Sequence, residues 1–200
     1  MSLEVEFEVP TWDQIYEMLL NLAEKIRKGD FRPHIIVGIS RGGWPPARVM
    51  SDLLGNPELA NVRVEFYLGV AETKKKPVIT QAVSMPVKAK NVLVLDDVAD
   101  TGHSLKLVKD HVMRKGADAV KTGTIYYKPW SVIVPDFYEK ETRRWIVFPW
   151  ERKETVRCLV MNCRKEGTSI ERAKLKLVEG GLDLSLAERF VNEVLKEERK

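Results

Sequence analysis

Three carboxylates follow one apolar stretch in the middle of the chain. Val92–Leu95 is a run of four apolar residues, Asp96 and Asp97 come directly after it, and Asp100 follows three residues later. Such a run predicts a strand that is buried on both faces, as in a parallel sheet. Because open α/β sheets bind ligands at the carboxyl ends of their strands, we expect these acids to lie in a ligand crevice.

Small polar residues connect the acids to a helical pattern. Residues 101–104 include a glycine and two hydroxyl residues, and helical apolar spacing then runs from Leu105 to a stop at Gly116. Backbone N–H groups at a helix start, approached closely at Gly102, form an anion site. The neighbouring acids would repel a phosphate unless they bind sugar hydroxyls or a divalent cation. The stretch therefore predicts a site for a ribose phosphate with Mg²⁺; the alternative is an acidic turn after a core strand.

A second strand, loop and helix lie earlier in the chain. His34–Ile39 predicts another buried strand, and Ser40-Arg41-Gly42-Gly43 separates it from a helix that begins near Trp44. Proline is tolerated in the first turn of that helix. Two glycines that expose backbone N–H groups, next to an arginine, predict a second anion site. A simple tight turn is the alternative.

Strands that alternate with helices predict an α/β fold with a mostly parallel sheet. Thr11 and Gln14 form a capping-box pattern at the start of an amphipathic helix that Gly29-Asp30 ends. The expected strands, apart from those already named, are a short edge strand at 3–9 and strands at 61–68, 78–83 and 119–127.

The chain changes character from Arg152 onward. A helical stripe of apolar residues ends near Gly167, and two further capping boxes are predicted, Thr168 with Glu171 and Ser185 with Glu188. We therefore expect a core with its hood over residues 1–151 and a helical C-terminal extension over 152–200. The last helix mixes both charge signs, which favours oligomer packing or sheet covering over DNA binding. The extension also holds both cysteines, Cys158 and Cys163, which are expected to be reduced core residues that do not bridge, because their helical spacing points them apart.

Composition bounds the class of protein. Thirty-three basic and twenty-nine acidic residues give a net charge of +4, which suits an anionic small molecule and does not by itself indicate nucleic acid. No apolar run approaches the ~20 residues of a membrane span. The N-terminus alternates apolar and acidic residues, unlike a signal peptide. A cytoplasmic location is expected.

The stretch from Asn91 to Leu105 resembles the PRPP-binding motif of the type I phosphoribosyltransferases, with an apolar strand, two acids, a third acid, Thr-Gly and a hydroxyl residue. The resemblance implies a mostly parallel twisted sheet flanked by helices, with a small hood. It also implies a Mg²⁺-dependent enzyme that transfers 5-phosphoribosyl from PRPP and releases pyrophosphate.

The resemblance assigns a role to each residue of the two motifs. Asp96 and Asp97 would bind the ribose, with Asp97 also near the metal, and Asp100 would be the general base that takes the purine N7 proton. The remaining positions follow from the two loops: the 5′-phosphate on Asp100, Thr101, Gly102, His103 and Ser104, and the pyrophosphate on Ser40, Arg41, Gly42 and Gly43.

Two later segments resemble the xanthine-guanine subgroup of that family. Lys128-Pro follows a strand, and Trp145-Ile146 precedes a Pro-Trp-acid that ends in Glu151. Lys128 would then bind O6 of a 6-oxopurine, Trp145 would cover one face of the base, and the Ile146 backbone would meet its other edge. Glu151 stands where the subgroup has an acid, and Trp130 has no counterpart. Adenine is disfavoured because its C6 amine offers Lys128 no acceptor.

The expected partners are PRPP, a purine base (guanine, xanthine or hypoxanthine) and the nucleotide product, in a homo-oligomer (dimer or tetramer). Lys74–Lys76 either reach the closed site or form a solvated hairpin tip. A different class of function remains as the alternative, a non-catalytic regulator of the same fold that senses PRPP or nucleotide and binds nucleic acid.

Overall fold

The computed structural model describes residues 5–67 and 76–198 of the chain. Contacts group the chain into two compact units. Residues 15–143 form one, which we call the sheet unit, and the segments up to residue 14 and from 144 form the other, the helical unit. The division expected at residue 151 stays a prediction, as does the hood.

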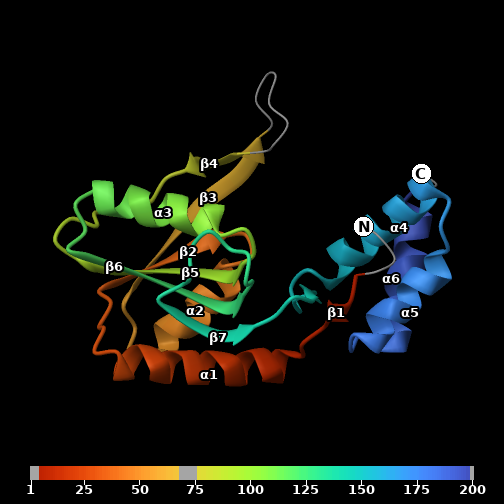
Figure 1. The fold of residues 1–200 in the computed structure, drawn as a ribbon, viewed down its shortest axis with the longest axis horizontal. Helices are drawn as coiled ribbons and strands as arrows, with labels where there is room; N and C mark the ends of the chain where they lie inside the picture. The colour runs from red at the N-terminus through yellow and green to blue at the C-terminus, as the bar shows by residue number, and fades with distance from the viewer. Residues whose placement is uncertain (1–4, 68–75, 199–200) are drawn as a thin grey trace. The chain divides into compact units, whose positions relative to one another are not determined.

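The sheet unit is built on one sheet, with strand order β4-β3-β2-β5-β6-β7 in the described residues. Only the β3–β4 pair is antiparallel, so the predicted mostly parallel α/β sheet is confirmed (Figure 1). The strands are β2 (Ile35–Ser40), β3 (Glu58–Tyr67), β4 (Lys76–Gln81), β5 (Asn91–Ala99), β6 (Ala119–Tyr127) and β7 (Phe137–Glu141).

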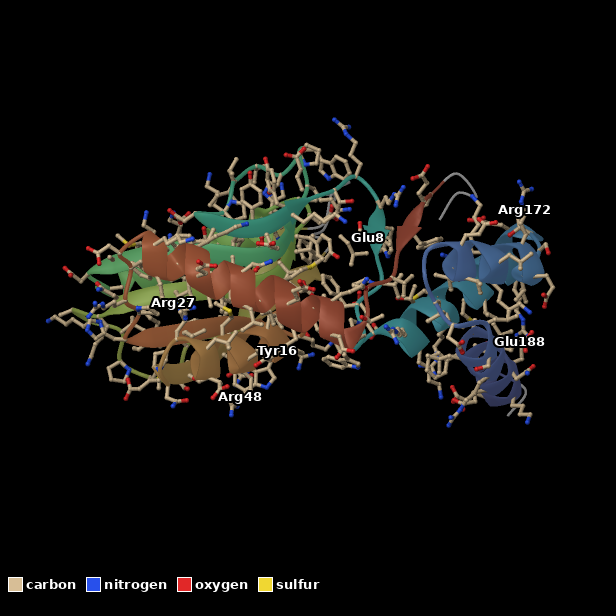
Figure 2. All side chains as sticks on the ribbon, turned by 90° about the horizontal axis from the view of Figure 1, so that it is seen from below. Glu8, Tyr16, Arg27, Arg48, Arg172 and Glu188 are labelled. Atoms are coloured by element: carbon tan, nitrogen blue, oxygen red, sulfur yellow. The ribbon has the colours of Figure 1, made fainter. Side chains whose placement is uncertain are left out.

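Helices cover both faces of this sheet. In Figure 1, α1 (Trp12–Lys28) and α2 (Trp44–Leu53) lie against one face, and α3 (His103–Arg114) lies against the other. The buried stripe of α3 packs on the central strands because its apolar residues recur every three to four positions. Arg27, labelled on α1 in Figure 2, donates from Nη1 to the carbonyl oxygen of Leu53 at the end of α2, 3.0 Å away.

The predicted capping box at the start of α1 is confirmed. The Thr11 N–H donates to Oε1 of Gln14 at 2.8 Å, and the Gln14 N–H donates to Oγ1 of Thr11 at 3.1 Å. These two bonds satisfy backbone donors that the first helical turn leaves without partners.

The central strand is longer than the apolar run predicted. β5 continues through the acids to Ala99, and Asp96 lies opposite Thr124 of β6. Backbone ladder bonds hold a strand regardless of side-chain polarity, so β5 continues past the apolar run and buries Asp97 and Ala99 as well.

The helical unit joins a short strand pair to three helices. β1 (Phe7–Glu8) pairs in parallel with β8 (Trp145–Ile146). The helices are α4 (Arg152–Glu166), α5 (Ile170–Glu179) and α6 (Leu184–Glu197), which share one apolar core with Phe7 and Val9. Exposed charged residues, such as Arg172 and Glu188 in Figure 2, lie on the helix surfaces. Both cysteines lie on α4 and are free, as predicted, but Cys158 is exposed and only Cys163 is buried, so the core position expected for Cys158 is wrong.

The two capping boxes predicted in the extension are wrong. Ser169, not Thr168, caps α5 by accepting from the Arg172 N–H, and Asp183, not Ser185, caps α6 by accepting from the Leu186 N–H. Neighbouring polar residues offer several equivalent cap positions, and a carboxylate at Asp183 gains from the helix dipole.

No helix among the described residues is long and apolar enough to cross a membrane.

A single acid sets the register of the edge strand β7. Asp136 accepts from the backbone N–H and from the hydroxyl of Thr122, both at 2.9 Å, and its own N–H donates to that hydroxyl at 3.0 Å. Lys121 and Lys109 pair with the same carboxylate at 3.0 and 3.4 Å. Burial alone would raise the pKa of Asp136, but the bonds from Lys121 and Thr122 and the charge of Lys109 lower it below its usual value.

We expect Asp136→Asn to lower the free energy of unfolding at neutral pH by about 1–2 kcal/mol, because it removes charge-assisted hydrogen bonds. Since the folded pKa is depressed, the stabilisation is present above the ordinary Asp pKa of 3.8 and disappears as the pH falls through the folded value. Urea unfolding over an acid pH series measures both effects.

The matched control is Asp110→Asn, which removes the same charge from an exposed position on α3. An Asp136→Asn variant whose stability differed from the wild type equally at all pH values would contradict the linkage.

Candidate functional site

Two loops meet at one edge of the sheet because β2 and β5 are adjacent parallel strands. Gly38 of β2 lies opposite Leu95 of β5, so both strands end at the same edge. The loop that follows β2 therefore reaches the acids that end β5, as expected for a crevice at the carboxyl ends of strands.

Glycine is required in the first loop by the closeness of that approach. A Cβ on Gly43 would lie 2.6 Å from the carbonyl oxygen of Leu95 and 2.8 Å from Cα of Asp96, and a Cβ on Gly42 would overlap the Asp97 carboxylate. Gly43 has φ −75°, so it is the absent side chain, and not a left-handed backbone, that the site needs. The structure thus brings the predicted anion loop and the acid pair into direct contact.

The start of this loop has its own fixed geometry. The Ser40–Arg41 peptide bond is cis, and the Ser40 hydroxyl accepts from Nδ2 of Asn61 at 3.3 Å. The Gly43 N–H donates to Ile39 at 2.8 Å, which folds the loop back on the strand end. Arg41 is exposed at the tip.

The two adjacent acids share one electrostatic environment. Burial, followed by the neighbouring Asp97 carboxylate, raises the pKa of Asp96 well above its usual value, although the Asp97 N–H donates to Asp96 Oδ1 at 3.0 Å. Asp97 is 8% exposed, and its Oδ1 accepts from the Val98 N–H at 2.8 Å. Such a pair favours ligands that offer hydroxyl donors or a cation.

The phosphate-type loop begins α3. Gly102 has φ 75° and precedes the first helical residue, His103, and its carbonyl oxygen accepts the first helical bond, from Lys106, at 3.0 Å. The backbone N–H groups of the first helical turn have no partner within the helix, and the turn carries no acidic residue. Thr101 and His103 are exposed and Ser104 is half-buried, so this end of α3 is suited to an anion.

The turn after β6 covers the same loop. The Lys128 N–H donates to Ala99 at 3.1 Å, and the Val132 N–H donates to Thr101 at 3.0 Å. Ile133 packs so closely that a side chain on Gly102 would lie 2.9 Å from its Cγ2. Lys128 is 4% exposed, so the predicted base-reading lysine lies buried beside the end of β5.

Sequence reasoning missed Trp130. Its indole N–H donates to Oδ1 of Asp100 at 3.2 Å, and Nζ of Lys128 lies 5.5 Å from the centre of its ring. The available signal was its position two residues after a lysine at a strand end. No local pattern pairs it with Asp100, thirty positions away.

Three of the predicted base-binding residues belong to the helical unit. The side chain of Trp145 is 46% exposed, and its backbone N–H donates to the carbonyl oxygen of Glu6 at 2.8 Å. The side chain of Ile146 is buried. Glu151 precedes α4, and its Oε1 accepts from the Phe148 N–H at 3.4 Å. The base pocket that would join them to Lys128 stays a prediction. Lys74 and Lys75 lie outside the described residues, and Lys76 begins β4.

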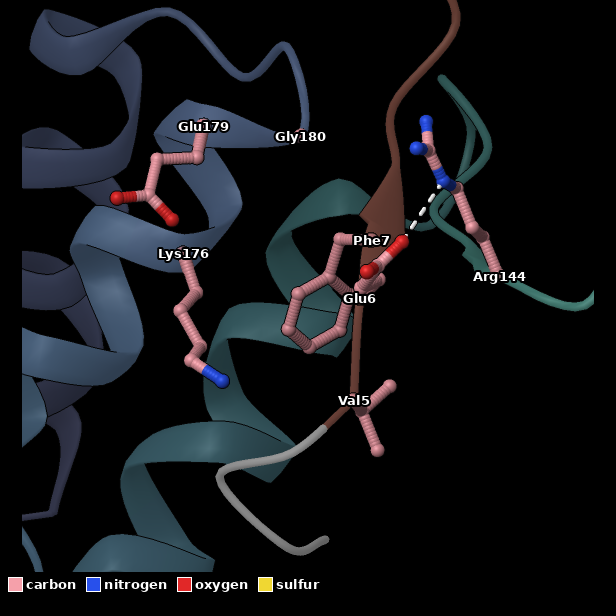
Figure 3. Close-up of a pocket in the computed structure, with 7 residues that line it drawn as sticks. All are labelled: Val5, Glu6, Phe7, Arg144, Lys176, Glu179 and Gly180. Atoms are coloured by element: carbon pink, nitrogen blue, oxygen red, sulfur yellow. Dashed lines mark hydrogen bonds and ion pairs between the residues drawn. The ribbon is translucent and has the colours of Figure 1, made fainter.

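A small pocket of about 260 Å³ lies in the helical unit; none of the predicted site residues lines it, although Trp145 pairs with its lining residue Phe7. Figure 3 shows side chains of both charge signs around it, and Arg144 pairs with Glu6 at 3.1 Å. Its lining residues are Val5, Glu6, Phe7, Arg144, Lys176, Glu179 and Gly180. The pocket is a gap between β1 and α5 with no constellation for chemistry.

The acid pair fits the magnesium that the resemblance implies. Carboxylate oxygens are the ligands that Mg²⁺ prefers, and Mg²⁺ is usually bound by one or two carboxylates together with substrate phosphates. No group of three or more His, Cys, Asp or Glu side chains suited to a metal occurs among residues 5–67 and 76–198. Asp97, beside the first loop, is the residue that would hold the ion with a bound phosphate.

Comparisons with known proteins agree with this geometry. A family model described as phosphoribosyl transferase domain matches residues 11–154. A xanthine-guanine phosphoribosyltransferase of Gluconobacter oxydans is 28% identical over 151 residues, which cover 74% of this chain and 86% of that protein.

Two solved structures extend the comparison. A purine phosphoribosyltransferase from Pyrococcus horikoshii is 40% identical, with TM-score 0.66, and the match covers 72% of this chain and 93% of that one. A protein of Neisseria gonorrhoeae with bound ppGpp is 20% identical, with TM-score 0.69, over 94% of this chain and 97% of that one. At that identity it shows likeness of fold alone, and this likeness extends into the C-terminal helices.

The family match spans well over half of the chain and contains both loops and all three acids of the sheet edge. The chain belongs to the phosphoribosyltransferase family.

Proposed function

We propose that this chain is a purine phosphoribosyltransferase that transfers 5-phosphoribosyl from PRPP to a 6-oxopurine and releases pyrophosphate. The observation that carries the proposal is the meeting of the Gly42-Gly43 backbone with the Asp96–Asp97 pair at one sheet edge. The relatives named as xanthine-guanine and purine phosphoribosyltransferases support the substrate class. Nothing in the comparisons supports the nucleic-acid-binding regulator.

PRPP would bind across the two loops. Asp96 and Asp97 accept hydrogen bonds from the ribose hydroxyls. The backbone and hydroxyl groups of residues 100–104 bind the 5′-phosphate at the start of α3. Ser40, Arg41, Gly42 and Gly43 bind the pyrophosphate. Mg²⁺, when bound by Asp97 and the pyrophosphate oxygens, supplies positive charge that stabilises the leaving group.

The reaction exchanges one bond at the anomeric carbon. The bond from that carbon to the pyrophosphate oxygen breaks, and the bond to the purine N9 forms. Asp100 accepts the proton that N7 loses, and Arg41 compensates negative charge on the departing pyrophosphate. Positioning and electrostatics therefore account for the rate in this scheme.

Four residues are assigned to recognition of the base. The buried Lys128 ammonium donates to O6, which selects against adenine because an unpaired buried donor is costly. Trp145 stacks on one face of the base, the Ile146 backbone binds its other edge, and Glu151 supports that segment. Guanine, xanthine and hypoxanthine all offer O6 to Lys128.

A homo-oligomer, a dimer or tetramer, stays part of the proposal.

The direct test is a pyrophosphate-release assay with PRPP, Mg²⁺ and a panel of purines and pyrimidines. Release is expected with the 6-oxopurines, much less with adenine and none with orotate. No release with any base, together with a mobility shift of DNA or RNA, would support the regulator instead.

Asp100→Asn is expected to lower kcat by about 10²–10⁴-fold, because an amide cannot accept the N7 proton. PRPP affinity, measured by calorimetry with Mg²⁺, should change less than about threefold, since backbone groups carry most of the phosphate binding. Asp118→Asn, on the surface before β6, serves as the control. Unchanged turnover in Asp100→Asn would refute the assigned base.

Gly42→Ala is expected to lower kcat/KM for PRPP by about 10²-fold, because the methyl group would displace the Asp97 carboxylate or the loop itself. Steady-state kinetics at varied PRPP measure this effect.

Gly55→Ala is the matched glycine control. Its φ of 85° makes alanine unfavourable, yet no atom lies within 4 Å of the new methyl group. This variant should lose thermal stability and keep its activity, whereas Gly42→Ala should lose activity. Equal kinetic parameters in the two variants would argue against the proposed pyrophosphate loop.

A further inference from the structure

Trp130 is held in place by backbone bonds at both ends of its turn. The Lys128 N–H donates to the end of β5 at Ala99, the Ser131 N–H donates back to Lys128 at 3.0 Å, and the Val132 N–H donates to Thr101. The turn is therefore attached to the strand and loop that carry Asp100. Because its anchors are main-chain bonds, the position of Trp130 does not depend on its own side chain.

The indole makes two polar contacts and little packing. It is 51% exposed, its N–H donates to Asp100 Oδ1 at 3.2 Å, and its ring faces Nζ of Lys128 at 5.5 Å from the centre. A tryptophan that served the core would bury its large apolar surface, as Tyr126 and Phe148 do in this chain. Here one side chain contacts both Asp100, the proposed general base, and Lys128, the proposed O6 donor.

We propose that Trp130 is a positioning residue for the transfer reaction, an inference that rests on the proposed function. Its N–H binds one oxygen of Asp100 and fixes the plane of the carboxylate, so that Oδ2 receives the N7 proton. Its ring restrains the Lys128 ammonium, which sets the distance between the groups that meet N7 and O6 of the same base. An indole N–H only donates, so Trp130 takes no part in the proton transfer.

This geometry restricts two long-range partners with one rigid group. A carboxylate held at one oxygen loses its rotation about χ2, and general-base catalysis depends strongly on such alignment. Among aromatic side chains, the indole ring of tryptophan also attracts an ammonium group most strongly. Asp100 follows β5 and Lys128 follows β6, and Trp130 contacts both residues.

Two variants separate the two contacts. Trp130→Phe keeps an aromatic ring near Lys128 and removes the N–H, so kcat should fall about tenfold while KM for PRPP and for the base stays within twofold. Trp130→Leu removes both contacts, so KM for guanine should also rise about threefold. Val134→Ala, an exposed apolar position of the same segment, should match the wild type.

A double-mutant cycle gives the reading that a merely structural role would not produce. If Trp130 acts through Asp100, Trp130→Phe should cost about tenfold in the wild-type background and no further activity in Asp100→Asn. Single-turnover pyrophosphate release with guanine measures all four proteins, and thermal melts confirm that each is folded.

The outcomes are distinct. If the wild type turns over and Trp130→Phe has the same kcat, the inference is overturned and the proposed function stays intact. A rise in kcat would also overturn it, because the indole would then compete with the substrate for Asp100. Equal losses in both backgrounds would show that Trp130 acts independently of Asp100. A wild type without turnover on any purine would refute the proposed function and the inference together.

Discussion

The close approach of one backbone segment to the end of one strand organises the molecule. β2 and β5 are parallel neighbours with Gly38 opposite Leu95, so the loop after β2 must cross the end of β5 at van der Waals distance. Gly42 and Gly43 permit this crossing because any side chain at either position would overlap the strand or its acids. The predicted anion loop and the acid pair lie in contact because of these two glycines.

That closeness restricts the ligands that the crevice accepts. Burial and the adjacent Asp97 raise the pKa of Asp96, so the pair resists a second negative charge. The backbone N–H groups at the start of α3 and the exposed Arg41 of the first loop favour anions instead. A phosphorylated sugar satisfies both demands, because its hydroxyls meet the acids while its phosphates reach the loops. This part of the fold thus favours a ligand that carries both hydroxyl groups and phosphate groups.

The parts predictable from sequence are those that local chemistry determines. Buried strands, the helical stripe of α3 and the Thr11 cap follow from apolar spacing and short-range hydrogen bonds, and the structure confirms them. The strand β7 was missed altogether, and Asp136, which bonds to Thr122 at its start, makes a tertiary contact with no periodic signature. The caps of α5 and α6 were wrong by one and two positions, since several polar neighbours compete for the same role.

The proposed site divides according to which unit supplies its residues. Every residue assigned to PRPP belongs to the sheet unit, where loop and strand geometry alone bring them together. Three of the four residues assigned to the base belong to the helical unit, and their role in base recognition stays a prediction. Lys128 is the exception, and Trp130 connects it to Asp100. The sheet unit therefore contains one contact chain, through Trp130, between the proposed general base Asp100 and the proposed O6 donor Lys128.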